Sequence, residues 1–234
     1  MIKKKTFSLV LPAYNEELNI RKNINEFIKT GVFDEIIAVD NNSTDKTSFE
    51  IKKTSAKYVF EKQQGYGIAI RTGMSFCTSD YIVMCEPDGS FRASDIFKFL
   101  TYINEFDCVF GTRTAKSSIG KGAKMPFYLR VGNVLVAKLL EYLFLGPTLS
   151  DVGCTYKLIS QKSYKQIKHK LKVVGSELQP EIMIHLIKNK NKIIEIPVHY
   201  LERKGKSKIT YNFNSSLAVA IRMVILIITL RFGV

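Results

Sequence analysis

The stretch that decides the fold is EIIAVDNNSTDKTSFE, residues 35–50, which joins two kinds of pattern. Its first six residues form an apolar, β-branched run that is typical of a buried strand and ends at Asp40. The polar segment after this run offers helix-capping residues, and Thr47 and Glu50 have the spacing of a capping box. The stretch therefore predicts a strand-to-helix unit with a carboxylate at the end of the strand.

The same alternation continues on both sides of this unit. The runs FSLVLP, AKYVF and YIVMC each predict a strand, and the segments after them have the periodicity and polar start of helices. Asn15 is expected to cap the first helix, whose apolar face is formed by Ile20, Ile24, Phe27 and Ile28. Strands that alternate with helices indicate a parallel sheet covered on both faces, and such a sheet binds ligands outside the carboxyl ends of its strands.

The second half of the chain extends this α/β pattern. DCVFGTR predicts a fifth strand that ends near Arg113, and FYLRVGNVLVAKLLEYLF and SELQPEIMIHLIKNK predict helices. KIIEIPVHY predicts a late strand that leads into the basic loop LERKGKSK. The sequence has no internal repeat and no low-complexity linker, so residues 1–212 are expected to form one domain and residues 213–234 a C-terminal apolar helix.

Composition and charge narrow the class of protein. Of the 234 residues, 46% are hydrophobic, which is enough for a folded core. Lys and Arg exceed Asp and Glu by 35 to 21, and the net charge of +14 indicates an anionic partner: a phosphorylated substrate, an acidic membrane or nucleic acid. Nucleic acid is the weakest of the three, because no nucleic-acid-binding motif accompanies the basic runs. The four cysteines lack metal or redox spacing and are expected to be buried free thiols, which suits a reducing compartment.

The C-terminal segment SSLAVAIRMVILIITLRFGV, residues 215–234, is apolar but carries Arg222 inside it. A bilayer span takes about 20 mostly apolar residues, and this segment is expected to fall short. Two interpretations compete: a helix packed on the domain or on another subunit, and a helix that lies in the membrane interface. The positive charge of the upstream run RKGKSK favours the interface.

The stretch YIVMCEPDGSF, residues 81–91, ends in two carboxylates one residue apart, Glu86 and Asp88. Oxygen ligands of this kind, at the end of a strand, suit Mg²⁺ or Mn²⁺ held jointly with the phosphates of a substrate. The alternative is a plain surface turn, because Pro-Asp and Asp-Gly are common turn dipeptides.

The neighbouring motifs favour the metal site. LPAYNEE, VDNNSTDKT, GYGIAIRTG and EPDGSF occur in this order at predicted strand-to-helix junctions, and together they resemble the family 2 glycosyltransferases. FGTR, DVGCTYKLIS and IPVHYLERKGKSK extend the resemblance towards the branch of dolichyl-phosphate mannose synthase and the polyprenyl-phosphate glycosyltransferases. The resemblance covers most of residues 6–210 and implies an α/β fold of the GT-A type, with a Rossmann-like, mostly parallel sheet flanked by helices.

The resemblance also implies a donor site at the predicted strand ends. Asp88 matches the last acid of the family's D-x-D motif, the usual ligand of the divalent ion, Mg²⁺ or Mn²⁺, that bridges the donor diphosphate. Glu86 matches the first acid of that motif, and its longer arm favours a contact with the metal through water. The residues expected to contact the donor nucleotide are Pro12, Tyr14, Asn15, Glu16, Asp40 and Glu86.

Later segments imply the residues that handle phosphates and the acceptor. Arg113 and Arg130 match arginines near the phosphates and the acceptor in the lipid-phosphate branch, and they join Asp88 and Glu181 as candidate catalytic residues. Glu181 would be the base or the orienting group if the acceptor were a hydroxyl, and otherwise it is a carboxylate in the first turn of a helix. The remaining residues expected at the acceptor and the phosphates are Lys157, Arg203, Ser207 and Lys208.

These residue types fit one reaction. Cleavage of a sugar-diphosphate bond leaves negative charge on the diphosphate, which a divalent ion and arginines stabilise. The resemblance implies an inverting transferase that moves a sugar from a UDP- or GDP-sugar to a polyprenyl- or dolichyl-phosphate at the cytoplasmic face of a membrane, with peripheral attachment. The alternatives are transfer to a saccharide hydroxyl in cell-surface polysaccharide assembly, and a non-catalytic module that binds nucleotide-sugars.

Overall fold

The computed structural model describes residues 4–123, 125–203 and 213–233. Seven strands form one sheet in the order β3-β2-β1-β4-β6-β5-β7. The strands are β1 Phe7–Ala13, β2 Glu35–Asp40, β3 Lys57–Phe60, β4 Tyr81–Met84, β5 Cys108–Thr112, β6 Lys157–Ser160 and β7 Ile193–Pro197. β6 runs antiparallel to β4 and β5, and the other neighbouring pairs are parallel. The predicted mostly parallel α/β sheet is therefore confirmed.

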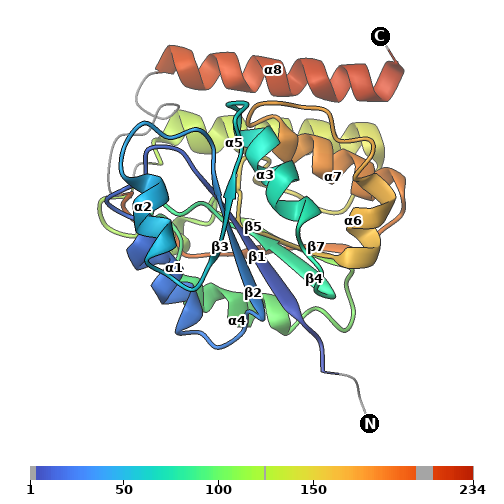
Figure 1. The fold of residues 1–234 in the computed structure, drawn as a ribbon. Coiled ribbons are helices and arrows are strands. Elements are labelled where there is room, and N and C mark those ends of the chain that lie inside the picture. The colour runs from blue at the N-terminus through green and yellow to red at the C-terminus, as the bar shows by residue number, and fades with distance from the viewer. Residues whose placement is uncertain (1–3, 124, 204–212, 234) are drawn as a thin grey trace.

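Helices cover both faces of this sheet (Figure 1). They are α1 Ile20–Ile28, α2 Thr47–Lys52, α3 Tyr66–Ser75, α4 Ile96–Leu100, α5 Phe127–Phe144, α6 Gln161–Ile167, α7 Leu178–Lys188 and α8 Phe213–Phe232, with short 3₁₀ turns at Ala93–Asp95 and Lys116–Ser118. Residues of α1, α2 and α4 pack on one face of the sheet, and residues of α3, α5, α6, α7 and α8 build the core on the other.

The strands explain this two-sided arrangement. All seven residues of β1 are buried, and Leu9 and Leu11 pack with the α1 side while Val10 packs with the α3 side. Side chains of a strand alternate between the two faces, so an uninterrupted apolar run needs a helix layer on each side. The four cysteines of the chain are buried and form no disulfide, as predicted.

The first helix begins later than the sequence suggests. Asn15 was expected to be its N-cap, but α1 starts at Ile20, and Asn15 has a left-handed φ of 55°. The Asn15 side chain instead accepts a hydrogen bond from the backbone N–H of Thr44, at 2.9 Å. The loop after β1 is thus tied to the loop after β2, and this contact between distant segments outweighs the local capping preference.

The capping box predicted from Thr47 to Glu50 is wrong as well. Thr47 is the first residue of α2 and not the residue before it. The side chain of Asp45 accepts hydrogen bonds from the backbone N–H and the hydroxyl of Thr47, at 2.9 and 2.5 Å. Asp45 therefore takes the role at the helix start that the pattern gave to Thr47.

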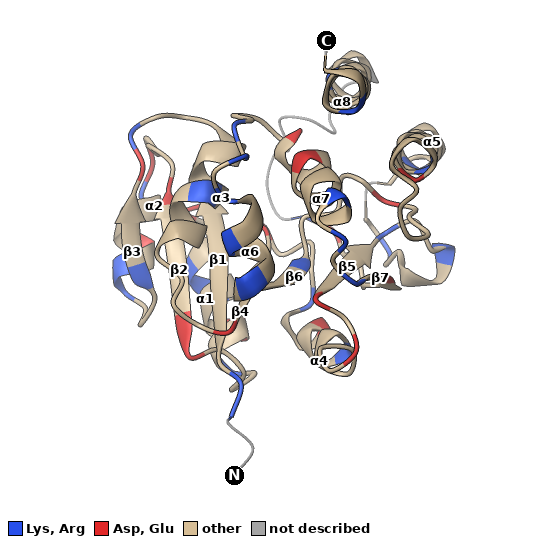
Figure 2. Ribbon diagram, turned by 90° about the vertical axis from the view of Figure 1, so that its right-hand side faces the viewer, with Lys and Arg blue, Asp and Glu red and all other residues tan. Residues whose placement is uncertain are grey.

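Helix α8 lies on the outside of the molecule and runs alongside α5 and α7 (Figures 1 and 2). Met223 and Ile227 on its inner side are buried, and Arg222 forms an ion pair with Glu177, directly before α7. By length and composition Asn214–Phe232 could cross a membrane, so the expectation that the segment is too short is wrong. Its inner face nevertheless packs on the domain.

Candidate active site

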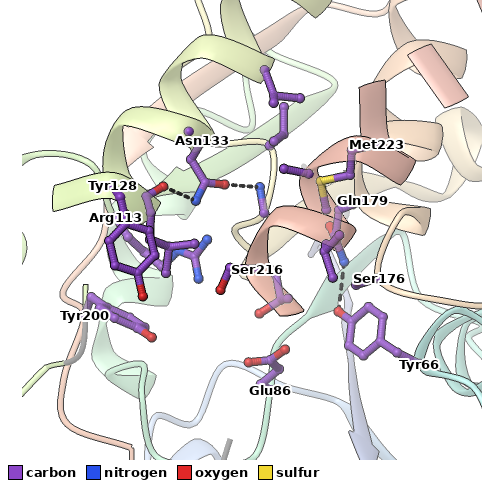
Figure 3. A pocket seen from close by; sticks show the side chains of 18 of the residues that line it. Tyr66, Glu86, Arg113, Tyr128, Asn133, Ser176, Gln179, Tyr200, Ser216 and Met223 are labelled. Atoms are coloured by element: carbon purple, nitrogen blue, oxygen red, sulfur yellow. Dashed lines mark hydrogen bonds between the residues drawn. The ribbon is translucent and has the colours of Figure 1, made fainter. Parts of the chain in front are cut away.

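A cavity of about 450 Å³ lies at the carboxyl ends of the central strands. Its floor is formed by residues after β4 and β5, and its walls come from α5, α8, the loop before β6 and the start of α7 (Figure 3). One end of the cavity is charged, with Glu86, Asp88, Arg113 and Arg203. The cavity thus occupies the position that the topology of a parallel sheet favours for a ligand.

The two acids after β4 differ in their surroundings. Asp88 is buried; its Oδ1 accepts a hydrogen bond from the backbone N–H of Ser90 at 2.9 Å. Glu86 is half-buried at the cavity, and its carboxylate accepts no hydrogen bond from the described residues. Burial, and next the charge of Asp88, raise the pKa of Glu86 to about 7. Asp88 is the fixed acid of the pair, and Glu86 faces the space in which a ligand would bind.

Arg203 forms ion pairs with acidic residues that follow two different strands. Its Nη2 donates to Glu16 Oε1 at 2.7 Å, and its Nη1 lies 3.1 Å from Asp88 Oδ2. Burial raises the pKa of Glu16, while Asn19 and Arg203 oppose this rise. The guanidinium group therefore serves as the cation that compensates two buried carboxylates, one after β1 and one after β4.

A divalent ion fits these residues only together with another ligand. Among residues 4–123, 125–203 and 213–233, no three His, Cys, Asp or Glu side chains are grouped as a complete metal site. Mg²⁺ is commonly bound by one or two carboxylates plus the phosphates of a substrate. Asp88 and Glu86 supply that partial ligand set, with Arg203 as the competing cation on Asp88.

Arg113 is held in place by a buried carboxylate. Its Nε and Nη2 donate to the two oxygens of Asp151 at 2.8 and 2.9 Å, and its backbone N–H donates to the same group at 2.9 Å. Burial alone would raise the pKa of Asp151, but Arg113 outweighs this effect and the pKa lies below its ordinary value. The bidentate pair leaves Nη1 of Arg113, which makes no hydrogen bond with the described residues, at the wall of the cavity.

Glu195 of β7 fixes the loop that carries Asp151. Its carboxylate accepts hydrogen bonds from the backbone N–H of Ser150 at 2.8 Å, from the Ser150 hydroxyl at 2.6 Å and from the backbone N–H of Asp151 at 3.1 Å. Asn133 of α5 supports the same loop, because its Oδ1 accepts from the backbone N–H of Gly153 at 3.2 Å. A chain of contacts therefore runs from Glu195 through Asp151 to Arg113.

The model of the family named "Glycosyl transferase family 2" matches residues 8–168 of this chain. The chain belongs to this family. It is 28% identical over 205 residues to the dolichyl-phosphate hexose transferase of Haloferax volcanii, with 86% of each chain covered. It is also 25% identical to glycosyltransferase AglJ of that organism, over 85% of this chain and 64% of that protein.

The solved structures show the same fold. Glucosyl-3-phosphoglycerate synthase from Mycobacterium tuberculosis, in complex with Mn²⁺, UDP and phosphoglyceric acid, matches with a TM-score of 0.75 at 19% identity, over 98% of this chain and 79% of that one. At this identity the likeness shows the GT-A-type fold alone. The protein is therefore a family 2 glycosyltransferase, and its cavity is the candidate active site.

The structure of the glycosyltransferase brings together several residues that the sequence singled out. Glu86, Asp88, Arg113 and Arg203 line the cavity, and Glu16 reaches it through Arg203. The other predicted donor residues lie at the ends of β1 and β2. Pro12 is buried in β1, Tyr14 is half-buried and Asn15 exposed in the following loop, and buried Asp40 accepts from the backbone N–H of Ser43 at 3.0 Å.

Arg130 and Lys157 do not line the cavity. The guanidinium group of Arg130 lies over the ring of Phe127. Neighbouring residues of α5 line the cavity, but Arg130 itself does not. Lys157 is fully buried in β6, where its Nζ donates to the carbonyl of Cys154. It lies over the ring of Phe110 and does not line the cavity, so its expected contact with the acceptor stays a prediction. Ser207 and Lys208 lie outside the described residues.

Glu181 also differs from its expected role as a base. It is buried, and its carboxylate accepts hydrogen bonds from the backbone N–H groups of Lys172 and Val173 at 3.0 and 3.1 Å. These bonds hold the loop before α7, and Glu181 is not part of the cavity lining. The geometry thus favours the alternative weighed for this residue, a structural carboxylate in the first turn of a helix.

Sequence reasoning missed Glu195, Asn133, Gln179 and Ser216. Asn133, Gln179 and Ser216 line the cavity of the transferase, and Glu195 supports it. A carboxylate inside the apolar strand KIIEIPVHY was an available signal for Glu195. The other three sit on apolar helices, where a single polar residue gives no comparable signal.

We expect Glu195→Gln to impair sugar transfer while the protein stays folded. The loss of its charge weakens three hydrogen bonds to the loop of Asp151, so Arg113 loses its fixed position, and misplacement of such a group costs about 10- to 100-fold in rate. Steady-state kinetics would measure the change. The control is Glu26→Gln, which removes an exposed carboxylate paired with Lys22 on α1. Wild-type kcat/KM in Glu195→Gln would contradict the proposed chain of contacts.

We expect Arg203→Gln to bind Mn²⁺ more tightly than the wild type in the absence of nucleotide. The substitution removes the cation that occupies Asp88, so the ion no longer has to displace it. Titration followed by electron paramagnetic resonance of free Mn²⁺ reports this affinity without any turnover. Arg21→Gln, at an exposed ion pair with Glu50, is the matched control. Equal or weaker Mn²⁺ binding by Arg203→Gln would show that Arg203 does not compete for the site.

Proposed function

We propose that this glycosyltransferase moves a sugar from a UDP- or GDP-sugar to a lipid phosphate of the polyprenyl or dolichyl type, with inversion at the sugar carbon. The observation that carries the proposal is the change in chemistry along the cavity. Charged side chains occupy the end at the strands, whereas apolar side chains of two helices form the opposite end. A prenyl phosphate has the same division into an anionic head and an apolar chain.

The apolar end of the cavity lies between α5 and α8. Its apolar residues are Leu129, Val136, Leu217, Val219, Ala220 and Met223. Apolar walls favour a hydrocarbon chain because its burial removes apolar surface from water, while a saccharide would lose its hydrogen bonds with water there. This part of the cavity supports a lipid acceptor over a saccharide.

The charged residues support an anionic nucleophile. A lipid phosphate carries negative charge at neutral pH and needs positioning, whereas a hydroxyl needs a general base. Arg113 presents guanidinium N–H groups at the cavity wall, and the carboxylate of Glu181 is engaged elsewhere with backbone N–H groups. The similarity to a dolichyl-phosphate hexose transferase agrees with this choice of acceptor.

The donor is assigned to the ends of β1, β2 and β4. Asp40, Glu16 and Tyr14 are placed beside the nucleotide, and Asp88 with Glu86 would hold a Mg²⁺ or Mn²⁺ ion. Solved structures of glucosyl-3-phosphoglycerate synthase contain Mn²⁺ with UDP-glucose or Mg²⁺ with UDP, which supports a divalent ion in this transferase too. When bound, the ion supplies positive charge to the departing diphosphate.

The outer face of α8 supports attachment to a membrane. Ile221, Ile225, Ile228 and Phe232 are exposed and recur every three or four residues, so they share one side of the helix. The inner side packs on the domain, so the helix is proposed to lie in the membrane interface, as a C-terminal element (213–234) beside the catalytic domain (1–212). The cytoplasmic face is proposed, because nucleotide-sugars would reach the site there. A lipid could then enter the cavity between α5 and α8 directly from the bilayer.

Transfer to lipid can be tested with purified protein. We expect label from a panel of radiolabelled UDP- and GDP-sugars, supplied with Mn²⁺ and vesicles that contain polyprenyl phosphate, to appear in the organic phase. Asp88→Asn is expected to lower this transfer by at least about 100-fold, since it removes the charge that would hold the ion. Label confined to water-soluble glycan would contradict the lipid acceptor, and wild-type transfer by Asp88→Asn would contradict the metal site.

Membrane attachment can be tested by flotation with anionic vesicles. The double variant Ile221→Gln/Ile225→Gln removes two exposed apolar side chains from α8 and is expected to float at least about tenfold less than the wild type, because each buried side chain of this size contributes about 1.5–3 kcal/mol. Phe49→Gln/Phe97→Gln is the control, because these side chains are equally exposed but lie on α2 and α4. Equal flotation of both variants would indicate that the outer face of α8 does not bind the membrane and packs on protein instead.

A further inference from the structure

Two side-chain oxygens at the cavity lack hydrogen-bond partners. Gln179 Oε1 on α7 and Thr155 Oγ1 in the loop before β6 bond to none of the described residues, although both residues line the cavity. Gln179 is 1% exposed and Thr155 is 5% exposed. Buried polar atoms of a folded protein nearly always have a hydrogen-bond partner. These two oxygens therefore indicate that a bound ligand supplies the missing partners.

Gln179 is held in a defined orientation beside the acidic end. Its Nε2 donates to the hydroxyl of Tyr66 at 2.8 Å, which leaves the Tyr66 proton available for another acceptor. Burial, and next the nearby charge of Glu86, raise the pKa of Tyr66 well above its ordinary value, so this proton is retained. Figure 3 shows Tyr66 and Gln179 on one side of the cavity, Arg113 and Tyr200 on the other, and Glu86 between the two sides.

The chemistry of this side of the cavity suits a sugar better than a prenyl chain or a phosphate. A prenyl chain offers no hydrogen bonds, and the oxygens of a donor diphosphate offer no hydrogen-bond donor to a carbonyl oxygen. A sugar hydroxyl both donates and accepts, so it can pair with the amide oxygen, with the threonine hydroxyl and with the phenol of Tyr66. The transferred sugar also has to lie between the diphosphate and the acceptor, and these three groups line the same cavity as the acidic strand ends and the apolar residues of α5 and α8.

We propose that Gln179, Thr155 and Tyr66 form the subsite that binds the hydroxyl groups of the transferred hexose, and that Gln179 is a specificity-determining residue. The inference rests on the proposed function, since that function supplies a nucleotide-sugar to this cavity. A site built to bond a hydroxyl group discriminates strongly against a sugar that lacks the group, because its own polar atoms are then left unpaired. The subsite thus selects the donor through the hexose, separately from the nucleotide.

Calorimetric binding with Mn²⁺ tests the subsite without any acceptor. UDP, GDP, UDP-glucose, UDP-galactose, UDP-N-acetylglucosamine and GDP-mannose would be titrated into the wild type and into Gln179→Met, which keeps the length of the side chain and removes the amide. We expect affinity for the nucleoside diphosphate to stay unchanged and affinity for the preferred nucleotide-sugar to fall about five- to tenfold, as for the loss of one hydrogen bond. Thr155→Val is a second variant with the same expected pattern.

Gln161→Met is the matched control. Gln161 is also a glutamine whose Oε1 has no partner among the described residues, but it lies on α6, and its Nε2 donates to the carbonyl of Cys77 at 3.1 Å. It does not line the cavity, so this variant is expected to bind every ligand like the wild type. A loss that followed merely from replacing a glutamine with a buried, unpaired amide oxygen would appear here too.

Deoxy donors identify the hydroxyl group. Nucleotide-sugars that lack one hydroxyl group at a time would be compared between the wild type and Gln179→Met. We expect one deoxy sugar to bind the wild type five- to tenfold more weakly than the parent sugar. Gln179→Met should bind this deoxy sugar and the parent sugar equally well, because the variant already lacks the hydrogen bond to that hydroxyl group.

The proposal would be overturned if Gln179→Met and Thr155→Val weakened nucleoside diphosphate and nucleotide-sugar equally, or changed neither. An absence of lipid-linked product would instead count against the proposed acceptor, because these binding measurements use donors alone. The two failures are therefore distinguishable.

Discussion

The buried ion pair between Arg113 and Asp151 is the interaction on which the active site depends. It links the end of β5 to the loop before β6, the strand that runs against the direction of its neighbours. The fully buried carboxylate of Asp151 would be costly without its guanidinium partner, so the loop and the strand end are held together. Glu195 of β7 anchors the same loop, and the wall of the cavity is therefore set by three strands of the sheet.

This constraint gives the cavity two kinds of surface. The strand ends provide charged groups in fixed positions, and α5 and α8 provide apolar walls above them. α8 packs on α5 and α7, with Met223 and Ile227 buried and Arg222 paired with Glu177. The proposed reaction uses this division: positioning by charge where the bond is exchanged, and burial of hydrocarbon where the acceptor would enter.

Much of the fold could be predicted from local patterns. Buried parallel strands appear in the sequence as apolar runs that end in polar residues, which is why Asp40, Glu86, Asp88 and Arg113 were found at strand ends. β6 was missed because it has four residues and starts with the buried Lys157.

Contacts between distant segments account for the other misses. Asn15 looks like a helix cap, but it bonds to the next loop. The sequence left Glu181 open between a base and a structural carboxylate, and its bonds to the backbone of the loop before α7 favour the second. Gln179 and Glu195 gain their positions only when the helix and the late strand are packed, so no local pattern could assign their partners.

In the proposed reaction the cavity between α5 and α8 receives the prenyl chain of a lipid phosphate. Photolabelling with a prenyl phosphate that carries a diazirine near its head group tests this directly, followed by peptide mapping. We predict that the label attaches to α5 and α8 around Val136 and Met223, and that unlabelled polyprenyl phosphate competes it away. Labelling spread over the exposed surface, or unaffected by the competitor, would contradict the account.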